Sequence, residues 1–302
     1  PQPEQLLVHK GPILPMKNVV ASQKSLIRTW LAFRDKSDST ADLLNILNVD
    51  FPDKSDLLVR NRVPGYASTS RELGSNRIDY GRFSEGSHII SHFVLPEKGK
   101  QSVLILRNWK NSDAWKQFIM SPSVFVRKMI NRGEGVIIPM IFGQNISDNL
   151  SGYRAQIEAS YLYTSFNRTL HEYQIQDLAT TVGLATSKLG ISPKNLAVVA
   201  ERGISLIGLV GWCILSSRIQ LGPFAGDFKG LDFVNPAHWA KHAYCPLILK
   251  GGGMKSLSRL CGRRKGIASG VLQGQGKHLP TGFSVRPRAI GLDGLLRAVL
   301  QI

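Results

Sequence analysis

The sequence predicts an α/β protein built on a mostly parallel, doubly wound sheet. Three short apolar runs, Ser102–Leu106, Gly135–Phe142 and Asn195–Val199, are typical of strands that are buried on both faces. Stretches with helical spacing of apolar residues separate these runs, at Ser123–Asn131 and over residues 170–189. Strands that alternate with helices in this way favour a parallel sheet with helices on both of its faces.

The first 75 residues predict a helical arm ahead of a main domain at residues 76–302. Ser22–Arg34 and Thr40–Leu47 have apolar residues at three- and four-residue spacing, which predicts two amphipathic helices. The main domain then opens with two segments in which apolar and polar residues alternate, Ile78–Ser84 and His88–Leu95. With Ser-Glu-Gly between them, these segments predict a β-hairpin.

The remaining segments continue the α/β pattern less strongly. Gln144–Ser165 is polar without clear periodicity and predicts a surface excursion. Ile204–Leu215 is apolar almost all round and predicts a buried helix. Phe224–Phe228 and Lys265–Val271 are weaker strand candidates. From about residue 271 the chain is basic, and an irregular tail is the alternative there to a regular last strand and helix.

The composition is that of a globular protein, with 43% hydrophobic and 20% charged residues, and it argues against wholesale disorder. No apolar run reaches the roughly 18 to 20 residues that a membrane span needs, and no amino-terminal stretch has a signal-peptide layout. The cysteines Cys213, Cys245 and Cys261 form no C-x-x-C pair, so three buried thiols are favoured over one disulfide with a free thiol. Compartment and oligomeric state stay open.

Positive charge is concentrated in the carboxyl-terminal part of the chain. There are 38 Lys and Arg against 21 Asp and Glu, a net charge of +17. From Lys250 to the end, ten basic residues stand against one acid, Asp293. Such a field attracts polyanions such as nucleic acid, acidic polysaccharide or an anionic membrane surface. A solvated basic face is the alternative, and no zinc-finger or RNA-binding signature accompanies the charge.

The turn after Val199 is the place where chemistry is expected, because ligands of parallel α/β sheets bind at the carboxyl ends of the strands. A strand that turns at once into a buried helix is the setting of a nucleophile elbow, where G-x-S-x-G exposes a serine. Aligned on that pattern, the nucleophile position is Arg202, and Ala200 and Ile204 take the glycine positions. A guanidinium cannot act as an acyl-transfer nucleophile. Ser205 follows inside the helix, where its hydroxyl is expected to pack or to bond the preceding turn.

The stretch Thr164–Gly203, with its FNRTL segment leading into the long helix, resembles the acetyl xylan esterase-like, carbohydrate-esterase branch of the α/β-hydrolases. Further pieces resemble that family in the same order and extend the likeness over roughly residues 75–272, namely Ser102–Gln117, Arg132–Gln144, Ala225–Phe233 and Leu257–Gly270. The resemblance implies an α/β-hydrolase fold and an ancestry among hydrolases of acyl or carbohydrate esters. No cofactor is implied, and a small ester or carbohydrate is the implied ligand.

The chain departs from the family at every part of the triad. Arg107 and Asn108 stand where a His-Gly turn usually contributes to the oxyanion hole, and Met140 stands where an aspartate is usual. No carboxylate follows Gly270, where the triad acid is expected, and the sole histidine near the last expected position is His278. A Ser-His-Asp device needs all three parts within hydrogen-bond reach. The triad is therefore interpreted as degenerate.

Several other side chains are candidates for a ligand site. Asp227 and Asp232 lie near a predicted strand end, where they could orient a histidine, bind a sugar hydroxyl or cap a loop. Trp109 follows a strand end and is the best placed of four tryptophans to stack on a sugar, whereas Trp212 is expected in the core. The other two are Trp115 and Trp239.

The histidine pairs do not predict a metal site. His238 and His242 share one helix face, but the sequence HWAKH lacks the glutamate of H-E-x-x-H and no third ligand is near. His88 and His92 share one face of a predicted strand and are expected to be structural. Three N-x-S/T sequons begin at Asn145, Asn149 and Asn167, and they matter only in a glycosylating compartment.

Three functional hypotheses follow. The first is an ester hydrolase, with Ser205, Asp227 and His278 as the remaining catalytic candidates and with oxyanion donors at Gly203 and near Asn108. The second is a non-catalytic protein on the same fold that binds an anionic or carbohydrate ligand through a pocket with Arg107, Arg202 and Lys229 at its rim. The third is binding of a polyanion through the basic carboxyl-terminal segment.

Overall fold

The computed structural model describes residues 49–64, 76–82, 89–109, 111–141, 170–233 and 253–301. All of them belong to one compact unit, Asp38–Ile302, which is distinct from a unit at Pro1–Ser37. The predicted helices at Ser22–Arg34 and Thr40–Leu47 and the polar excursion at Gln144–Ser165 lie outside the described residues. The helical arm predicted over residues 1–75 therefore stays a prediction.

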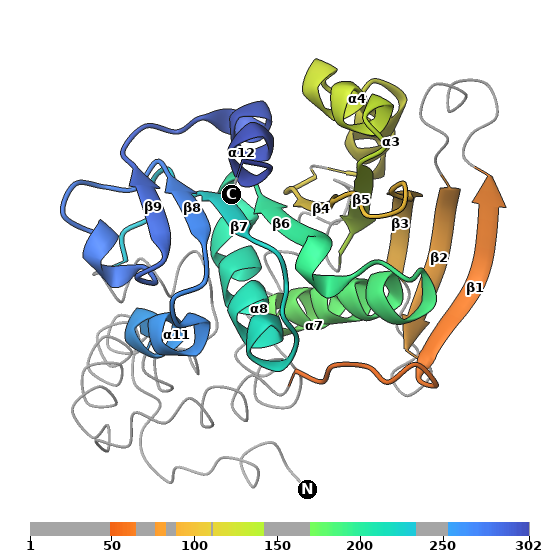
Figure 1. Ribbon diagram of the computed structural model, residues 1–302, viewed down its shortest axis with the longest axis horizontal. Coiled ribbons are helices and arrows are strands. Elements are labelled where there is room, and N and C mark those ends of the chain that lie inside the picture. Colours follow the sequence, from red (N-terminus) through yellow and green to blue (C-terminus); the bar gives the residue numbers. More distant parts are fainter. Residues whose placement is uncertain are drawn as a thin grey trace, which may run out of the picture. The chain divides into compact units, whose positions relative to one another are not determined.

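The described strands form a single nine-stranded sheet in the order β1-β2-β3-β5-β4-β6-β7-β8-β9 (Figure 1). Neighbours from β1 to β5 pair antiparallel, and neighbours from β5 to β9 pair parallel. The strands are β1 Leu57–Pro64, β2 Asn76–Arg82, β3 Ile89–Val94, β4 Ser102–Leu106, β5 Gly135–Met140, β6 Leu196–Ala200, β7 Phe224–Asp227, β8 Gly266–Ser269 and β9 Phe283–Arg286. The predicted α/β class is thereby confirmed as a mixed sheet with helices.

The central strands are apolar throughout because they are buried on both faces. In β6, Leu196, Val198 and Ala200 belong to one hydrophobic core, and Ala197 and Val199 belong to the other. Every residue of β4, β5 and β6 is buried. Each strand therefore contributes alternate side chains to two separate cores, one on each side of the sheet.

Helices cover both faces of the sheet (Figure 1). One core is closed by α7 Leu170–Gly183, α8 Ser205–Arg218 and α11 Gly253–Cys261. The other is closed by α3 Ser112–Met120, α4 Val124–Asn131 and α12 Gly291–Val299. A π-helical turn, Leu184–Lys188, continues α7. Among the residues that the structure describes, no helix has the length and apolar content needed to cross a bilayer.

Most of the predicted elements are present. The predicted hairpin corresponds to β2 and β3, which pair antiparallel, although the turn between them lies outside the described ranges. The predicted strands and helices of residues 102–228 correspond to β4, α4, β5, α7, β6, α8 and β7. No strand was predicted before Ile78, so β1 is an addition that lies inside the stretch assigned to the arm. The irregular alternative after residue 271 is wrong, because β9 and α12 follow in regular form.

The expectation of three buried thiols is also corrected. Cys213 of α8 and Cys261 of α11 form a disulfide, with their Cα atoms 4.9 Å apart. This bond fixes α11 to the central helix of the same core. Cys245 lies outside the described residues.

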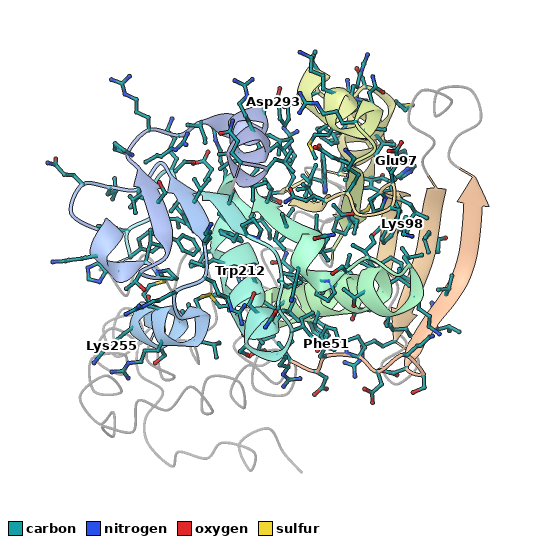
Figure 2. All side chains as sticks on the ribbon, viewed as in Figure 1. Phe51, Glu97, Lys98, Trp212, Lys255 and Asp293 are labelled. Carbon is teal, nitrogen blue, oxygen red and sulfur yellow. A yellow bond between two sulfur atoms is a disulfide. The ribbon has the colours of Figure 1, made fainter. Side chains whose placement is uncertain are left out.

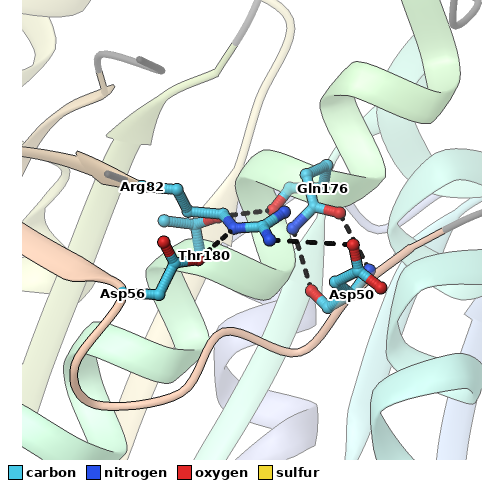
Figure 3. Close-up of polar contacts among 5 residues, drawn as sticks. All are labelled: Asp50, Asp56, Arg82, Gln176 and Thr180. Carbon is cyan, nitrogen blue, oxygen red and sulfur yellow. Dashed lines mark hydrogen bonds and ion pairs between the residues drawn. The ribbon is translucent and has the colours of Figure 1, made fainter. Parts of the chain in front are cut away.

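A polar cluster joins β2, α7 and the segment before β1 (Figure 3). Arg82 is 7% exposed, and its Nε donates to Asp56 Oδ2 at 2.7 Å while its Nη2 lies 3.6 Å from Asp50 Oδ2. Gln176 of α7 donates to the backbone carbonyl of Asp50 at 2.9 Å and accepts from its N–H at 3.0 Å. Because Arg82 is buried, its charge depends on these carboxylates for compensation.

We expect Arg82→Met to lower the free energy of unfolding by about 2 kcal/mol, since the change removes the charge-assisted hydrogen bond from Arg82 to the partly buried Asp56. Urea unfolding followed by circular dichroism measures this loss. Lys116→Met is the matched control, because Lys116 pairs with Asp113 at the exposed surface, where ion pairs contribute little. A loss no larger than that of the control would contradict the role assigned to Arg82.

Candidate functional site

The chain bends sharply between β6 and α8, at the carboxyl edge of the parallel strands. The strand ends at Ala200, Glu201 is extended, and a 3-10 turn at Arg202–Ile204 leads directly into α8. Arg202 has φ 36°, and it is the one non-glycine residue with positive φ in the described part of the chain. Side chains rarely adopt this conformation, and it is concentrated at functional sites. The elbow predicted at residues 200–204 is thus present, with Arg202 at its apex.

The beginning of α8 is held tightly against the strand that precedes it. A Cβ atom on Gly208 would lie 2.7 Å from the Cβ of Ala200, so only glycine allows this approach. Ser205 is fully buried, and its hydroxyl donates to the Ala200 carbonyl oxygen at 2.9 Å. This hydroxyl therefore fastens the helix to the strand and is not presented at the sheet edge.

Arg202 and Asp227 come together from neighbouring strands. Arg202 Nε lies 3.5 Å from Asp227 Oδ2; the arginine side chain is 66% exposed and the aspartate is fully buried. Asp227 ends β7, and its Oδ1 accepts from the backbone N–H of Lys229 at 3.0 Å. Gly270 has φ +69°, and a Cβ there would lie 2.8 Å from the same oxygen. The carboxylate is therefore enclosed by backbone and holds Arg202 from below.

Arg107 is held by a second ion pair at the same edge. Its Nε lies 3.0 Å from Glu201 Oε2, and its guanidinium lies over the rings of Trp109 at 5.3 Å and Phe118 at 5.5 Å. Trp109 is 2% exposed, so its ring supports Arg107 and does not present a face for a sugar. The contact depends on β4 and β6 being neighbours, which brings residues 107 and 201 together.

The two positions predicted to supply oxyanion donors are close together. Gly203 and Asn108 are both exposed. A Cβ built on Gly203 would lie 3.4 Å from Asn108 Nδ2. Exposed residues of the β4 turn and the elbow therefore lie together beside Arg202, and their N–H groups are of the kind that an anion can use.

His278 does not join this group. It lies in a 3-10 turn, Gly276–His278, between β8 and β9, where its carbonyl oxygen accepts from Ser258 of α11 at 2.9 Å. Within the described residues, no hydrogen bond or ion pair connects it to Arg202 or Asp227. The triad histidine was expected after the last strand, and Arg286 and Arg288 occupy that part of the chain.

The remaining candidates are structural or lie outside the described ranges. Asp232 accepts from Gln275 Nε2 at 2.6 Å in a loop contact. His92 and Trp115 are buried and pack on each other, with ring centroids 5.1 Å apart. In the part of the chain that the structure describes, no three His, Cys, Asp or Glu side chains form a metal-binding group. The undescribed candidates are His88, His238, His242, Trp239, Asn145, Asn149 and Asn167.

Positive charge dominates this edge of the sheet. Arg107 and Arg202 pair with Glu201 and Asp227, whereas Lys229, Arg286 and Arg288 are exposed and have no ion pair with any described residue. Sequence analysis did not single out Glu201, Arg286 or Arg288. The position of β9 beside β8, with Arg286 in register with Ser269, is what brings the last two arginines to the same edge. An anion is the ligand that this edge can bind.

No family model and no curated protein matches the sequence. The fold is similar to that of a candidate acetyl xylan esterase from Bacteroides fragilis, with a TM-score of 0.58 and 9% sequence identity over 93% of this chain and 84% of that one. It is also similar to an acetyl xylan esterase from Paenibacillus sp. R4, with a TM-score of 0.56 and 14% identity over 95% of this chain and 98% of that one. For acetyl xylan esterase 1 from Thermoanaerobacterium sp. the TM-score is 0.52 and the identity 13%, over 95% of this chain and 97% of that one. The resemblance to this branch of the α/β-hydrolases is confirmed at the level of the fold. A fold alone does not assign an activity.

Proposed function

We propose that this chain is a relative of the acetyl xylan and carboxylic ester hydrolases, with their doubly wound, mostly parallel sheet, that binds an acidic sugar or another small carboxylate instead of hydrolysing an ester. The observation that carries the proposal is the presence of Arg202 at the apex of the elbow. The strained position that displays a nucleophile in active enzymes displays a permanent cation here. A degenerate triad is part of the same proposal.

Arg202 is suited to bind a carboxylate. Its Nε faces Asp227, and its Nη1 and Nη2 have no partner among the described residues. Asp227 attracts the guanidinium at its Nε, and a guanidinium presents its remaining N–H groups as a planar fork, which matches the geometry of a carboxylate. Asn108 and the backbone N–H of Gly203 supply further donors, and Lys229 adds charge from the next strand.

Ester hydrolysis lacks an attacking group at this edge. Ser205 is buried and bonded to Ala200, and Asp227 is occupied by Arg202 and the Lys229 backbone. Acyl transfer by a serine needs a hydroxyl exposed above the sheet with a base in reach. The names of the acetyl xylan esterases with similar folds indicate a sugar polymer as their substrate. A sugar acid is therefore a plausible ligand for a binding protein that has this fold.

We expect the protein to bind glucuronate in isothermal titration calorimetry and not to bind neutral xylose. Arg202→Gln should weaken glucuronate binding roughly ten- to a hundredfold, because one charge-assisted hydrogen-bonding group contributes about 1.5–3 kcal/mol. Lys116→Met, a charge change at the exposed surface of α3, is the control and should leave the affinity unchanged.

Hydrolysis of 4-nitrophenyl acetate separates the two functions. The proposal requires that wild-type protein and Arg202→Gln show the same background rate. Turnover by the wild type that exceeds this background, or glucuronate binding that Arg202→Gln leaves intact, would refute the proposal.

A further inference from the structure

A second basic surface lies on the helical layer of α7, α8 and α11, and it is separate from the elbow. It consists of Lys255, Arg259, Arg263, Arg264, Lys265 and Lys277, and we call it the α11 surface. We propose that the α11 surface binds an acidic polysaccharide. This inference does not depend on the proposed function of the elbow.

The basic residues are gathered by the way that α11 packs. Met254, Leu257 and Cys261 are buried against the core, so Lys255 and Arg259, four residues apart, lie on the exposed side of the helix. Figure 2 shows Lys255 on the outer side of α11. Two successive exposed cations on one helix face give a row along the helix axis.

The turn after α11 and the 3-10 turn before β9 extend this row. Arg263, Arg264 and Lys265 connect α11 to β8, and the hydrogen bond from Ser258 to the His278 carbonyl brings Lys277 beside α11. No Asp or Glu occurs in residues 253–292. Arg263, Arg264 and Lys277 have no ion pair with any residue in the described ranges, so their charge is available to an external partner.

The turn after α11 and the elbow lie at different ends of the parallel strands. Lys265 precedes the first residue of β8, whereas Arg202, Asp227 and Arg286 lie at the carboxyl ends of β6, β7 and β9. Because these strands are parallel, the turn after α11 is at the amino edge of the sheet. A small ligand cannot contact both places at once.

The chemistry of the α11 surface favours a polysaccharide over other polyanions. None of the exposed large apolar side chains of the described residues lies on α11 or in the two turns, so the surface lacks anchors for a lipid bilayer. Within the described ranges it also lacks an exposed aromatic ring on which a base could stack. The last residue of α11, Cys261, forms a disulfide with Cys213. Disulfides are typical of secreted and extracellular proteins, and acidic polysaccharides are polyanions that such proteins encounter.

The test measures binding of fluorescently labelled polygalacturonate to the 302-residue chain at about 50 mM and about 200 mM salt. We expect Arg263→Glu/Arg264→Glu to weaken binding roughly tenfold or more at the lower salt concentration, with the difference shrinking at the higher one. The matched control is Arg127→Glu/Lys128→Glu. It changes the net charge by the same amount on exposed residues of α4, which covers the other face of the sheet.

Equal weakening by both double variants would overturn the inference, because net charge would then explain the binding. Tighter binding of duplex DNA or of anionic phosphatidylserine vesicles than of polygalacturonate would also overturn it. If Arg263→Glu/Arg264→Glu fails to fold by circular dichroism, Arg263→Gln/Arg264→Gln replaces it and should still weaken binding more than Arg127→Gln/Lys128→Gln. Glucuronate binding should be unaffected by the α11 variants, so failure here and failure at the elbow are distinguishable.

Discussion

Replacing Trp212 with alanine should lower the free energy of unfolding by about 4–5 kcal/mol. Trp212 on α8 is fully buried between the helix and the sheet, where its ring centroid lies 5.6 Å from that of Phe224 and 5.8 Å from that of Phe283 (Figure 2). Its Nε1 also donates to the Gly222 carbonyl oxygen at 2.9 Å. The substitution would leave a large cavity and an unpaired buried carbonyl. Urea unfolding monitored by circular dichroism measures the loss.

Trp212→Phe divides this effect into two parts. Phenylalanine keeps the contacts with Phe224 and Phe283 but removes the hydrogen bond to Gly222, so a loss of about 1–2 kcal/mol is expected. Because domains of this size have about 5–15 kcal/mol of stability in total, the phenylalanine variant should fold even if the alanine variant does not. A phenylalanine variant as unstable as the alanine variant would show that ring packing is not the main contribution.

The central strands could be predicted from the sequence because their environment is uniform. Ser102–Leu106 was predicted with its observed bounds, and Leu196–Ala200 was predicted to within one residue. Both are buried on two faces, so apolar residues fill every position after the first. The same reason explains α8, which is buried almost all round and was visible as a helix that is apolar on every side.

Edge elements could not be predicted in this way. β9 has the sequence FSVR with three exposed residues, so no apolar run marks it and its alternation of apolar and polar residues spans only four positions. β1 has an irregular register between Val59 and Asn61, which breaks the alternation of a half-buried strand. For α12, by contrast, the signal was present: Leu292, Leu295, Leu296 and Val299 have helical spacing and are buried.

The sequence predicted where the candidate site lies, but it did not predict which side chains contact one another there. A buried strand followed at once by a buried helix fixes an elbow at Arg202, whatever residue stands there. The Arg202–Asp227 and Arg107–Glu201 pairs depend instead on which strands are neighbours. β6 lies beside β7, which follows it in the chain, but also beside β4, from which β5 separates it in the sequence. The oxyanion pair of Gly203 and Asn108 came from the family resemblance, and the two residues do lie together.

The protein should lose roughly 3 kcal/mol of stability through one histidine as the pH falls from about 6.5 to about 4. His92 on β3 is 2% exposed and packs on Trp115, and neither ring nitrogen has a hydrogen-bond partner among the described residues. Burial, and secondarily the charge of Arg77 on β2, lowers the pKa of His92 from 6.5 to about 4. Between these values the unfolded chain binds a proton that the folded chain does not, so acid favours unfolding at 1.36 kcal/mol per pKa unit.

His92→Phe keeps a ring against Trp115 but cannot be protonated, so its stability should depend less on pH across this window. Urea unfolding at about pH 7, 5.5 and 4.5 measures the difference between the two proteins, in which the titration of all carboxylates cancels. The wild type should lose stability faster than the variant as the pH falls, and the divergence should level off about one pH unit below the folded pKa of His92. Parallel curves would mean that His92 is hydrated or paired in the folded state. In that case burial beside Trp115 would contribute to packing and would not make the stability depend on pH.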